Sequence, residues 1–571
     1  MRYFALATDY DGTLAHNGVV EPPAIAALER FRESGRRLLL VTGRELAGIQ
    51  AIFPRLDLFD RVVAENGAVL YNPETKQESL LAEPPSKRFI AALDRAGVAP
   101  LQVGRVILAT WESHSPVILK VIQSLGLELQ LIFNKGAVMV VPAGVNKATG
   151  LETALTELGL SLHNTAGVGD AENDHAFLGA CECAVAVADA LPALKERADI
   201  VTRGGYGAGV IELIGSLIAD DLRESAPRLA RHNIPLGKRS NDSAVNLPVY
   251  GVNVLIAGAS GSGKSTLTTG FIERLIESEY QVCVIDPEGD YQTLAGAAML
   301  GDGDRAPSVD EVASILEKPG QSVVLNLIAL PYNHQRPSFF KSLLPRLQEL
   351  RSRTGRPHWI VVDEAHHLLP ASEGPSGLIL PQQITGMMLI TVDPDHILPS
   401  MVAEVDTLIA VGENIGDSFR SFCAKSGEKS CPPCPDIQQR GQAIYWSRAS
   451  GEPPIQFSVA PCRTERVRHS RKYACGELEP ELSFYFRGPE GKLNLRAQNL
   501  VVFLQMAEGV DDATWMFHLR QGEYSRWFRE AIMNEDLATE AERIERDKSV
   551  PPRESRAQIQ NAIEQHFTLP A

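Results

Sequence analysis

Two aspartates stand close together near the start of the chain, in the run Asp9-Tyr10-Asp11-Gly12-Thr13 that follows the apolar stretch YFALAT. Carboxylates separated by one residue repel each other unless a cation lies between them, so this spacing indicates binding of a divalent metal such as Mg²⁺. Taken alone, the run is also compatible with a pair of solvated aspartates in a turn before a glycine.

Polar groups that follow other apolar strands weaken that alternative. Thr42 follows the strand LLLV, where a hydroxyl and the first amides of the next helix can hold an anionic oxygen. Lys147 opens another helix in GVNKATG and supplies a fixed positive charge, and the acidic run GDAEND at 169–174 follows the strand TAGV. Together these groups are the parts that phosphoryl transfer requires.

The segments DYDGT, VTGR, AENGA at 64–68, GVNK and GDAEND occur in this order, and over about residues 1–220 the chain resembles the haloacid dehalogenase (HAD) superfamily of phosphatases, specifically its Cof-like branch. The resemblance implies that Asp9 is the nucleophile and forms an aspartyl-phosphate. It also implies that Asp11 protonates the leaving alcohol and then activates water as a general base.

The same resemblance implies a bound Mg²⁺ and a phosphoryl-binding pair. The implied metal site is formed by the Asp9 carboxylate, the Asp11 backbone carbonyl and Asp170, with Asn173 and Asp174 supporting that side. Thr42 and Lys147 would hold the phosphoryl oxygens and stabilise the charge of the transition state.

An insert at about 74–141 has its own helices (85–97, 113–125) and strands (104–110, 129–133, 137–141). In the family that the chain resembles, such an insert is a cap that closes over the site and selects the leaving group. Asn134-Lys135-Gly136 is either a loop that faces the substrate or a solvated turn. Because the insert is small, we expect a small phosphate ester as substrate.

A second chemical site is a glycine-rich loop between the strand NVLIA and the helical stretch TLTTGFIERLIE. Backbone N–H groups of such a loop cradle phosphates, a lysine reaches the β- and γ-phosphates, and a hydroxyl holds Mg²⁺, so the loop predicts ATP binding. The predicted cofactor-binding residues are Gly258, Ser260, Gly261, Gly263, Lys264, Ser265 and Thr266, with Ser265 as the Mg²⁺ ligand.

Asp363 and Glu364 follow the apolar strand HWIVV. An acid at such a strand end suits the position associated with Mg²⁺, and a second acid can polarise the water that attacks the γ-phosphate. Glu364 therefore favours an ATPase over a kinase, which transfers phosphate to a hydroxyl. The alternative is that Glu364 is an acid at a helix N-terminus.

The order GASGSGKST, CVIDPEGDY, VVDEAHHLLP and LITVDPDH is similar to the HerA/FtsK-type branch of P-loop ATPases, over about 233–460. The resemblance makes Thr391 a γ-phosphate sensor and implies hexameric rings, with Arg420 as the candidate arginine that enters a neighbouring subunit. The small N-terminal barrel of DNA-pumping relatives is absent, and Val392 or Asp393 stands where a polar Gln is usual.

The elements that position these residues follow from the pattern of the sequence, in which short apolar strands alternate with amphipathic helices. We predict an α/β chain: a HAD Rossmann-like domain with a small inserted α/β cap, a RecA-like P-loop ATPase domain and a mainly helical C-terminal domain. The predicted boundaries are 1–222 with the cap at about 74–141, a linker at 223–246, 247–460 and 461–571.

The C-terminal segment carries no recognised catalytic set and is predicted to be a docking or assembly module. Its expected helices lie around 496–509, 523–534, 536–548 and 554–566, with Trp515 and Trp527 buried. At the start of this segment, the basic run at 463–472 is either a solvated linker face or a patch that tracks phosphates.

Composition limits the remaining choices. The chain has 571 residues and a net charge of −16, from 55 Lys and Arg against 71 Asp and Glu, which argues against a surface that binds nucleic acid throughout. No run of about 18 apolar residues occurs, so we expect a cytoplasmic protein without membrane contact. Most of the 8 cysteines should be reduced, although Cys431, Cys434, Cys462 and Cys475 could form a zinc site.

The sequence thus predicts a Mg²⁺-dependent phosphomonoester hydrolase for a small phosphorylated metabolite such as a sugar phosphate or a phosphoglycolate-like ester. It is fused to an ATP-hydrolysing domain that regulates or assembles it, with a homo-oligomer possible. Two alternatives stay open, a HerA/FtsK-like nucleic-acid motor with an end-processing HAD domain and a bifunctional kinase–phosphatase. The acidic charge and Glu364 respectively disfavour them.

Overall fold

The computed structural model describes residues 1–259, 261–331, 335–371, 385–412, 415–428, 431–434, 441–464, 478, 480, 482–532 and 534–566. Contacts divide the chain into two compact units, 1–464 and 465–571. Within the described residues no helix is both long enough and apolar enough to cross a bilayer.

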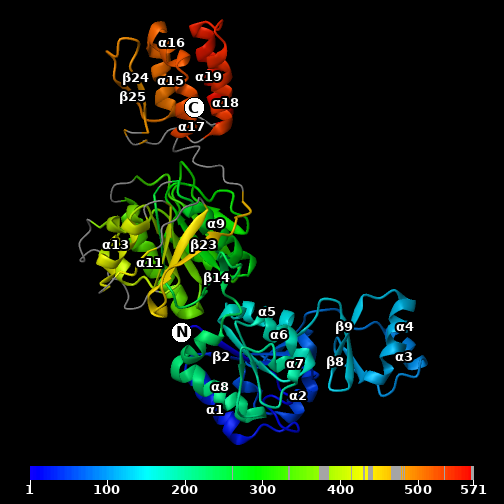
Figure 1. Ribbon diagram of the computed structural model, residues 1–571. Helices are drawn as coiled ribbons and strands as arrows, with labels where there is room; N and C mark the ends of the chain where they lie inside the picture. The colour runs from blue at the N-terminus through cyan, green and yellow to red at the C-terminus, as the bar shows by residue number, and fades with distance from the viewer. Residues whose placement is uncertain are drawn as a thin grey trace. The chain divides into compact units, whose positions relative to one another are not determined.

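The N-terminal sheet has eight strands in the order β12-β11-β10-β1-β2-β3-β4-β5, and the strands from β12 to β3 are parallel. Helices cover its faces, with α1 and α8 packed side by side (Figure 1). The strands are β1 (Ala5–Thr8), β2 (Arg37–Val41), β3 (Arg61–Ala64), β4 (Val69–Asn72), β5 (Gln77–Leu80), β10 (Thr165–Gly169), β11 (Cys183–Ala186) and β12 (Ile200–Val201). The helices are α1 (Pro22–Glu33), α2 (Leu46–Ile52), α5 (Lys147–Glu157), α6 (His175–Ala180), α7 (Pro192–Lys195) and α8 (Tyr206–Asp220).

The cap is an antiparallel sheet in the order β6-β7-β9-β8 with two helices on the face away from the N-terminal sheet (Figure 1). Its elements are β6 (Gln102–Val103), β7 (Leu108–Trp111), β8 (Leu129–Asn134), β9 (Ala137–Pro142), α3 (Lys87–Arg95) and α4 (Ser115–Leu125). Residues 77–80, inside the segment assigned to the cap, form β5 and pair with β4 of the N-terminal sheet.

The central sheet has eleven strands in the order β14-β13-β23-β22-β21-β15-β20-β19-β16-β18-β17. Its strands are β13 (Ile234–Lys238), β14 (Ala244–Leu247), β15 (Val254–Ala257), β16 (Val282–Asp286), β17 (Ala297–Leu300), β18 (Ser322–Asn326), β19 (Trp359–Val362), β20 (Met387–Thr391), β21 (Thr407–Val411), β22 (Gln442–Ser447) and β23 (Ile455–Val459). The helices are α9 (Lys264–Glu277), α10 (Val309–Leu316), α11 (Gln335–Thr354), α12 (Pro399–Ala403) and α13 (Ile415–Ser426). Strands β15, β16, β18, β19, β20 and β21 are buried on both faces, as their nearly continuous apolar sequences indicate.

Part of the predicted linker is structured, which corrects that assignment. Strands β13 and β14, at 234–247, form a hairpin, and β13 also pairs with β23 of the central sheet. The physical reason is burial on one face of the hairpin. Every second residue of each strand points to that face and is buried there, namely Ile234 and Leu236 in β13 and Val245 and Leu247 in β14.

A buried polar cluster joins the N-terminal and central sheets inside the first unit. His163 Nε2 lies 2.7 Å from the carbonyl oxygen of Ser278, which follows α9. The hydroxyl of Tyr280 donates to Glu182 Oε2 at 2.7 Å, and His358 Nε2 lies 3.2 Å from Asn164 Oδ1. Because unpaired polar groups are costly to bury, this cluster fixes the way in which the two sheets meet.

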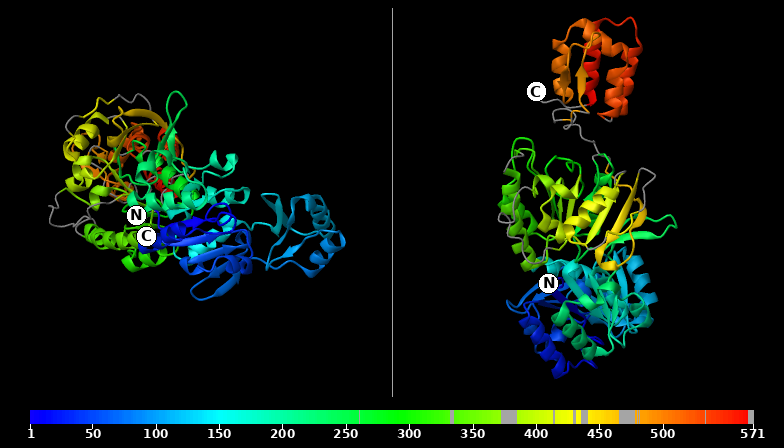
Figure 2. Two further views of the ribbon diagram at one scale, coloured as in Figure 1. Left: turned by 90° about the horizontal axis from the view of Figure 1, so that it is seen from below. Right: turned by 60° about the vertical axis from the view of Figure 1, so that its left-hand side comes forward.

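The second unit is mainly helical, which confirms the prediction for this part. Its described residues contain the hairpin β24 (Phe484–Phe486) and β25 (Leu495–Ala497), followed by five helices. The right-hand view of Figure 2 shows the strands of this orange and red unit beside helices. Trp515 and Trp527 are buried in an aromatic core, as expected. The helices are α15 (Leu500–Gly509), α16 (Asp512–Arg520), α17 (Glu523–Glu530), α18 (Glu535–Arg546) and α19 (Pro552–His566), of which α16 was not predicted.

Candidate active sites

The buried carboxylate of Asp9 lies directly beyond β1 and pairs with Lys147, whose Nζ is 2.5 Å from Asp9 Oδ1. Lys147 is the first residue of α5, and a capping box formed by Asn146 and Thr149 fixes the start of that helix. The same Nζ lies 2.6 Å from Asp174 Oδ1. One ammonium that is 1% exposed is therefore held between two buried carboxylates.

The pKa shifts of Lys147 and Asp9 indicate that this site carries an excess of negative charge. Burial lowers the pKa of Lys147, but the carboxylates of Asp174 and Asp9 outweigh burial, so the net pKa lies above its usual value. Burial raises the pKa of Asp9; Lys147 opposes this increase, while Asp174 and Asp170 add to it. The carboxylates thus exceed the buried cations that face them, which is the condition under which a divalent metal stabilises a site.

Three of the predicted metal residues meet at this point. Asp9, Asp170 and Asp174 each bring a carboxylate oxygen within 4.8 Å of the others. Asp174 Oδ2 accepts the backbone N–H groups of Asp170 and Ala171 at 2.8 and 2.9 Å, so Asp174 also fixes the loop that presents Asp170. All three are oxygen donors, the ligands that Mg²⁺ prefers, and the residues present fit the predicted metal.

Asp11 and Thr42 lie beside the buried group and are connected through Arg44. Two nitrogens of Arg44 donate to the two carboxylate oxygens of Asp11, Nε to Oδ2 at 2.6 Å and Nη2 to Oδ1 at 2.7 Å. Thr42 is fully buried, and its Oγ1 accepts the backbone N–H of Arg44 at 3.1 Å. Arg44 thus holds Asp11 in one orientation, a role that was not predicted although VTGR contains the residue.

The turn after β3 contributes two residues whose roles were also not predicted. Glu65 and Asn66 both have positive φ angles, 51° and 53°, which non-glycine residues rarely adopt. The buried carboxylate of Glu65 accepts three backbone N–H groups from the loop that leads into β7, those of residues 105, 106 and 107, at 2.9 to 3.1 Å. Asn66 Oδ1 accepts from Asn173 Nδ2 at 3.0 Å. This turn therefore fastens the cap to the strands that carry the site.

The glycine-rich loop connects β15 to α9, which begins at Lys264 as predicted. Nζ of Lys264 donates to the carbonyl oxygens of Gly258 and Ala259 at 2.6 and 3.1 Å. A Cβ at Gly258 would lie 2.0 Å from the carbonyl oxygen of Val411, so only glycine fits there. Gly261, Gly263, Ser265 and Thr266 occupy this loop and the first turn of α9, and Ser260 lies outside the described residues.

Asp363, Glu364 and Thr391 follow or end neighbouring strands at the same edge of the central sheet. Strand β20, which ends at Thr391, lies between β15 and β19. Asp363 is buried, and its Oδ1 accepts the backbone N–H of Glu364 at 2.9 Å. Glu364 has a positive φ of 39°, a conformation that an ordinary strand end does not require. This edge therefore brings together the glycine-rich loop, the acidic pair and the predicted sensor.

Two weaker predictions have different outcomes. Arg420 is 73% exposed at its side chain and pairs with Asp417 on α13, which leaves its role between subunits as a prediction. The proposed zinc set is corrected, because Cys431 forms a disulfide with Cys423 and is not a free thiolate. Cys475 and residues 465–472 of the basic run lie outside the described residues.

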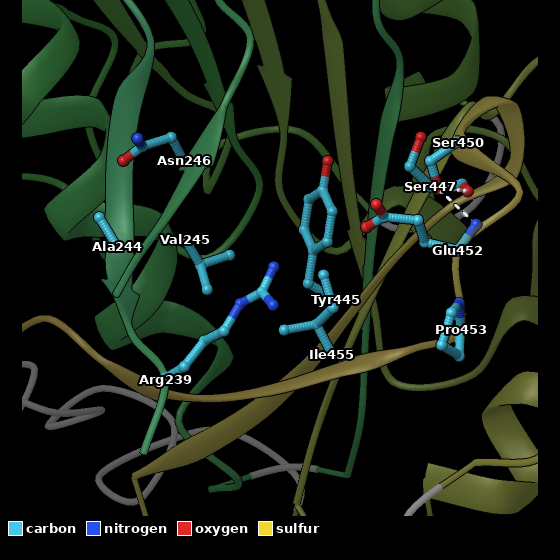
Figure 3. Close-up of a pocket in the computed structure, with 10 residues that line it drawn as sticks. All are labelled: Arg239, Ala244, Val245, Asn246, Tyr445, Ser447, Ser450, Glu452, Pro453 and Ile455. Atoms are coloured by element: carbon cyan, nitrogen blue, oxygen red, sulfur yellow. Dashed lines mark hydrogen bonds between the residues drawn. The ribbon is translucent and has the colours of Figure 1, made fainter. Parts of the chain in front are cut away.

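A cavity of about 230 Å³ lies against β14, β22 and β23, with Arg239, Tyr445 and Glu452 around it (Figure 3). It is lined by no predicted site residue. Its Ser447 pairs with Thr407, where β21 begins, whereas the glycine-rich loop meets the other end of that strand. The cavity is therefore distinct from the predicted nucleotide site.

Both α/β regions of the chain match families of known proteins. The family model of the haloacid dehalogenase-like hydrolases matches residues 6–99 and 118–214, and the model of the helicase HerA central domain matches 237–369. A phosphoglycolate phosphatase of Methanothermobacter thermautotrophicus is 31% identical over 221 residues, which are 37% of this chain and 96% of that protein. Phosphoglycolate phosphatase 2 of Saccharolobus solfataricus is 30% identical over 220 residues, 38% of this chain and 92% of that protein. A solved haloacid dehalogenase-like hydrolase from Bacteroides thetaiotaomicron has 20% identity and a TM-score of 0.34, and the match covers 38% of this chain and 99% of that one.

Proposed function

The chain belongs to the haloacid dehalogenase-like hydrolases and carries a HerA-type central domain, and on that premise we propose that it is a Mg²⁺-dependent phosphomonoester hydrolase fused to an ATPase. The observation that carries this proposal is the buried group in which Lys147 joins Asp9 to Asp174 beside Asp170. Its cytoplasmic location stays a prediction from the sequence.

In the proposed reaction the side chains of this site have separate tasks. Asp9 attacks phosphorus and forms an aspartyl-phosphate, and Asp11, oriented by Arg44, protonates the leaving alcohol and then activates the water that hydrolyses the intermediate. Lys147 and Thr42 hold phosphoryl oxygens. Mg²⁺, bound by the Asp9 carboxylate, the Asp11 carbonyl and Asp170, would neutralise charge between the nucleophile and the phosphate.

The proposed substrate is a small phosphorylated metabolite. The small cap supports this choice, and two relatives that align over nearly their full length are phosphoglycolate phosphatases. The test is a screen of purified full-length protein against phosphoglycolate, sugar phosphates and nucleotides with Mg²⁺. The matched variants are Asp9→Asn and Asp94→Asn, an exposed aspartate on α3. Activity that persists in Asp9→Asn would refute the proposal.

For the central domain we propose ATP binding by the loop 258–266 and hydrolysis assisted by Glu364. The family match and the strand order that gathers Lys264, Asp363 and Thr391 support this assignment. With γ-labelled ATP, label should appear as inorganic phosphate and should be lost in Glu364→Gln. Label transferred to a hydroxyl compound would favour the kinase–phosphatase alternative.

We further propose that nucleotide state influences the phosphatase through the buried cluster between the two sheets. Ser278 directly follows α9, which starts at Lys264, and His163 and Asn164 directly precede β10, which leads to Asp170. The test compares phosphatase turnover of the wild type and Lys264→Ala with and without ATP. Equal rates in all four conditions would exclude this coupling.

The match to a helicase central domain also favours a second candidate, a nucleic-acid motor that works as a ring, in line with the predicted homo-oligomer. It predicts ATPase activity that DNA stimulates, with binding that weakens steeply as salt rises. Absence of stimulation across DNA ends and single strands, together with a monomeric mass in solution, would contradict it.

A further inference from the structure

The hairpin between β8 and β9 brings a cap lysine into the predicted metal site. Lys135 Nζ lies 2.6 Å from Asp170 Oδ2 and 3.4 Å from the carbonyl oxygen of Asp11. These two oxygens belong to two of the three residues that the proposed Mg²⁺ site would use. The ammonium group of Lys135 therefore stands where a divalent cation is expected.

The backbone around this contact is built for it. Asn134 pairs with Ala137, so Lys135 and Gly136 form a two-residue turn, and both have positive φ angles, 47° and 83°. Asn and Gly are the residues that such a turn favours, so a lysine at its first position is strained. On the opposite side, a Cβ on Gly12 would lie 2.4 Å from both Lys135 Nζ and Asp170 Oδ2. The missing side chain of Gly12 leaves the space that this cation occupies.

A metal ion at these two oxygens would repel the ammonium of Lys135, because both carry positive charge, so metal binding favours release of the ammonium. The side chain is 48% exposed and extends from the cap, the part proposed to cover the leaving group. The cap face turned toward the site carries Trp111, which is 57% exposed and pairs with Ala137 beside the same turn. A released Lys135 would thus be placed among the groups that meet the alcohol part of the substrate.

We propose that Lys135 is an exchangeable cation that determines specificity: it competes with the divalent metal for Asp170 and the Asp11 carbonyl and, once displaced, pairs with an anionic group on the alcohol part of the ester. This inference rests on the proposed phosphatase function. It adds the residue that selects a phosphomonoester whose alcohol carries a carboxylate, and it links substrate selection to metal binding.

The test uses full-length protein with Lys135→Met, Lys135→Arg and Lys120→Met, the last an exposed cap lysine on α4 that serves as the matched control. Mn²⁺ affinity is measured by electron paramagnetic resonance without substrate. Lys135→Met should bind Mn²⁺ about fivefold more tightly than the wild type, the size expected when a half-exposed competing ion pair is removed. Lys120→Met should equal the wild type.

The second measurement is the ratio of kcat/KM for 2-phosphoglycolate to kcat/KM for ethyl phosphate, in which a methyl group replaces the carboxylate. This ratio should fall about tenfold or more in Lys135→Met and should be largely retained in Lys135→Arg, because the charge is kept. An unchanged Mn²⁺ affinity or an unchanged ratio in Lys135→Met would overturn the proposal. Failure of the wild type to hydrolyse either ester while it binds Mn²⁺ normally would instead refute the proposed function on which it rests.

Discussion

The two predicted sites of this chain balance their charges in different ways. In the N-terminal domain, Lys147 and Lys135 reach carboxylates that lie 27 to 138 positions away in the chain. In the central domain, Lys264 is held by carbonyl oxygens only five and six positions before it. The first site is thus a product of tertiary structure, whereas the second is a local motif that one strand, one loop and one helix suffice to form.

The largest expected effect comes from removing the nucleophile of the tertiary site. Asp9→Asn should lower phosphatase kcat/KM by at least about 10⁴-fold, because Asp9 alone provides the attacking oxygen. ATP hydrolysis should be unchanged. Measuring both activities on one preparation checks this, and a parallel loss of ATPase activity would show that the two sites depend on each other.

Removing the lysine of the local motif should have the next largest effect. Lys264→Ala should lower ATPase kcat by about 10² to 10³-fold, because a fixed positive charge is lost from the γ-phosphate. Because Lys264 donates to carbonyl oxygens of the loop that directly precedes it, thermal stability should change little. Release of inorganic phosphate and a melting curve measure the two results, and a large drop in melting temperature would contradict the local character of this site.

Neutralising Glu182 in the buried cluster between the two sheets should destabilise the fold, because the charged groups that face it remain. Glu182 is 3% exposed and contacts Arg2, His163 and Tyr280. Glu182→Gln should therefore lower the free energy of unfolding by about 3 kcal/mol. Denaturant unfolding measures this, with Glu196→Gln, an exposed glutamate after α7, as the control. Equal stability of the two variants would mean that the cluster does not hold the sheets together.

This loss should depend on pH in a defined direction. Burial by itself raises the pKa of Glu182, but His163 and Arg2 outweigh burial, and the net pKa lies well below its usual value. Because the folded pKa is lower than the unfolded one of about 4.3, ionised Glu182 stabilises the fold above that pH and loses its contribution as the pH falls further. The difference between wild type and Glu182→Gln should be constant near neutrality and shrink below about pH 4.

The smallest effect is expected at Asp174, which acts through other residues. Asp174→Asn should weaken metal binding and phosphatase activity by about 10 to 100-fold, because it positions Lys147 and the backbone that presents Asp170. Mg²⁺ titration by calorimetry and steady-state kinetics measure the two effects, with Asp94→Asn as the control. A loss as large as that of Asp9→Asn would place Asp174 among the groups that contact substrate or metal directly.

The same contrast explains what could be predicted from the sequence. The glycine-rich loop and the strand-end acids are local, so Lys264, Asp363 and Asp9 could be recognised from their neighbours in the chain. The pairings of Arg44 with Asp11 and of Lys135 with Asp170 depend on how distant segments meet. Sequence patterns without aligned relatives carry no signal for such contacts.

The hairpin of β13 and β14 and helix α16 were not predicted, because their local sequences give no clear periodic pattern. Pro, Ser and Asn around 234–247 concealed a two-residue alternation of buried side chains that forms β13 and β14. Helix α16 is capped by Asp511, which accepts the N–H of Thr514, but its apolar residues do not form one clear face. In both cases packing against the neighbouring elements decided the structure, and local patterning did not.

The hydrogen bonds between Glu65 and the backbone of the cap affect how this enzyme could change during evolution. Glu65 contacts residues 105 to 107 through their backbone N–H groups, so a substitution there keeps the donors unless it introduces proline. Val106 and Ile107 are buried, so these two positions still require apolar side chains. The cap can thus acquire new substrate-facing residues while its attachment stays intact. Because the attachment of the cap does not depend on its substrate-facing residues, the substrate preference can change without loss of the fold.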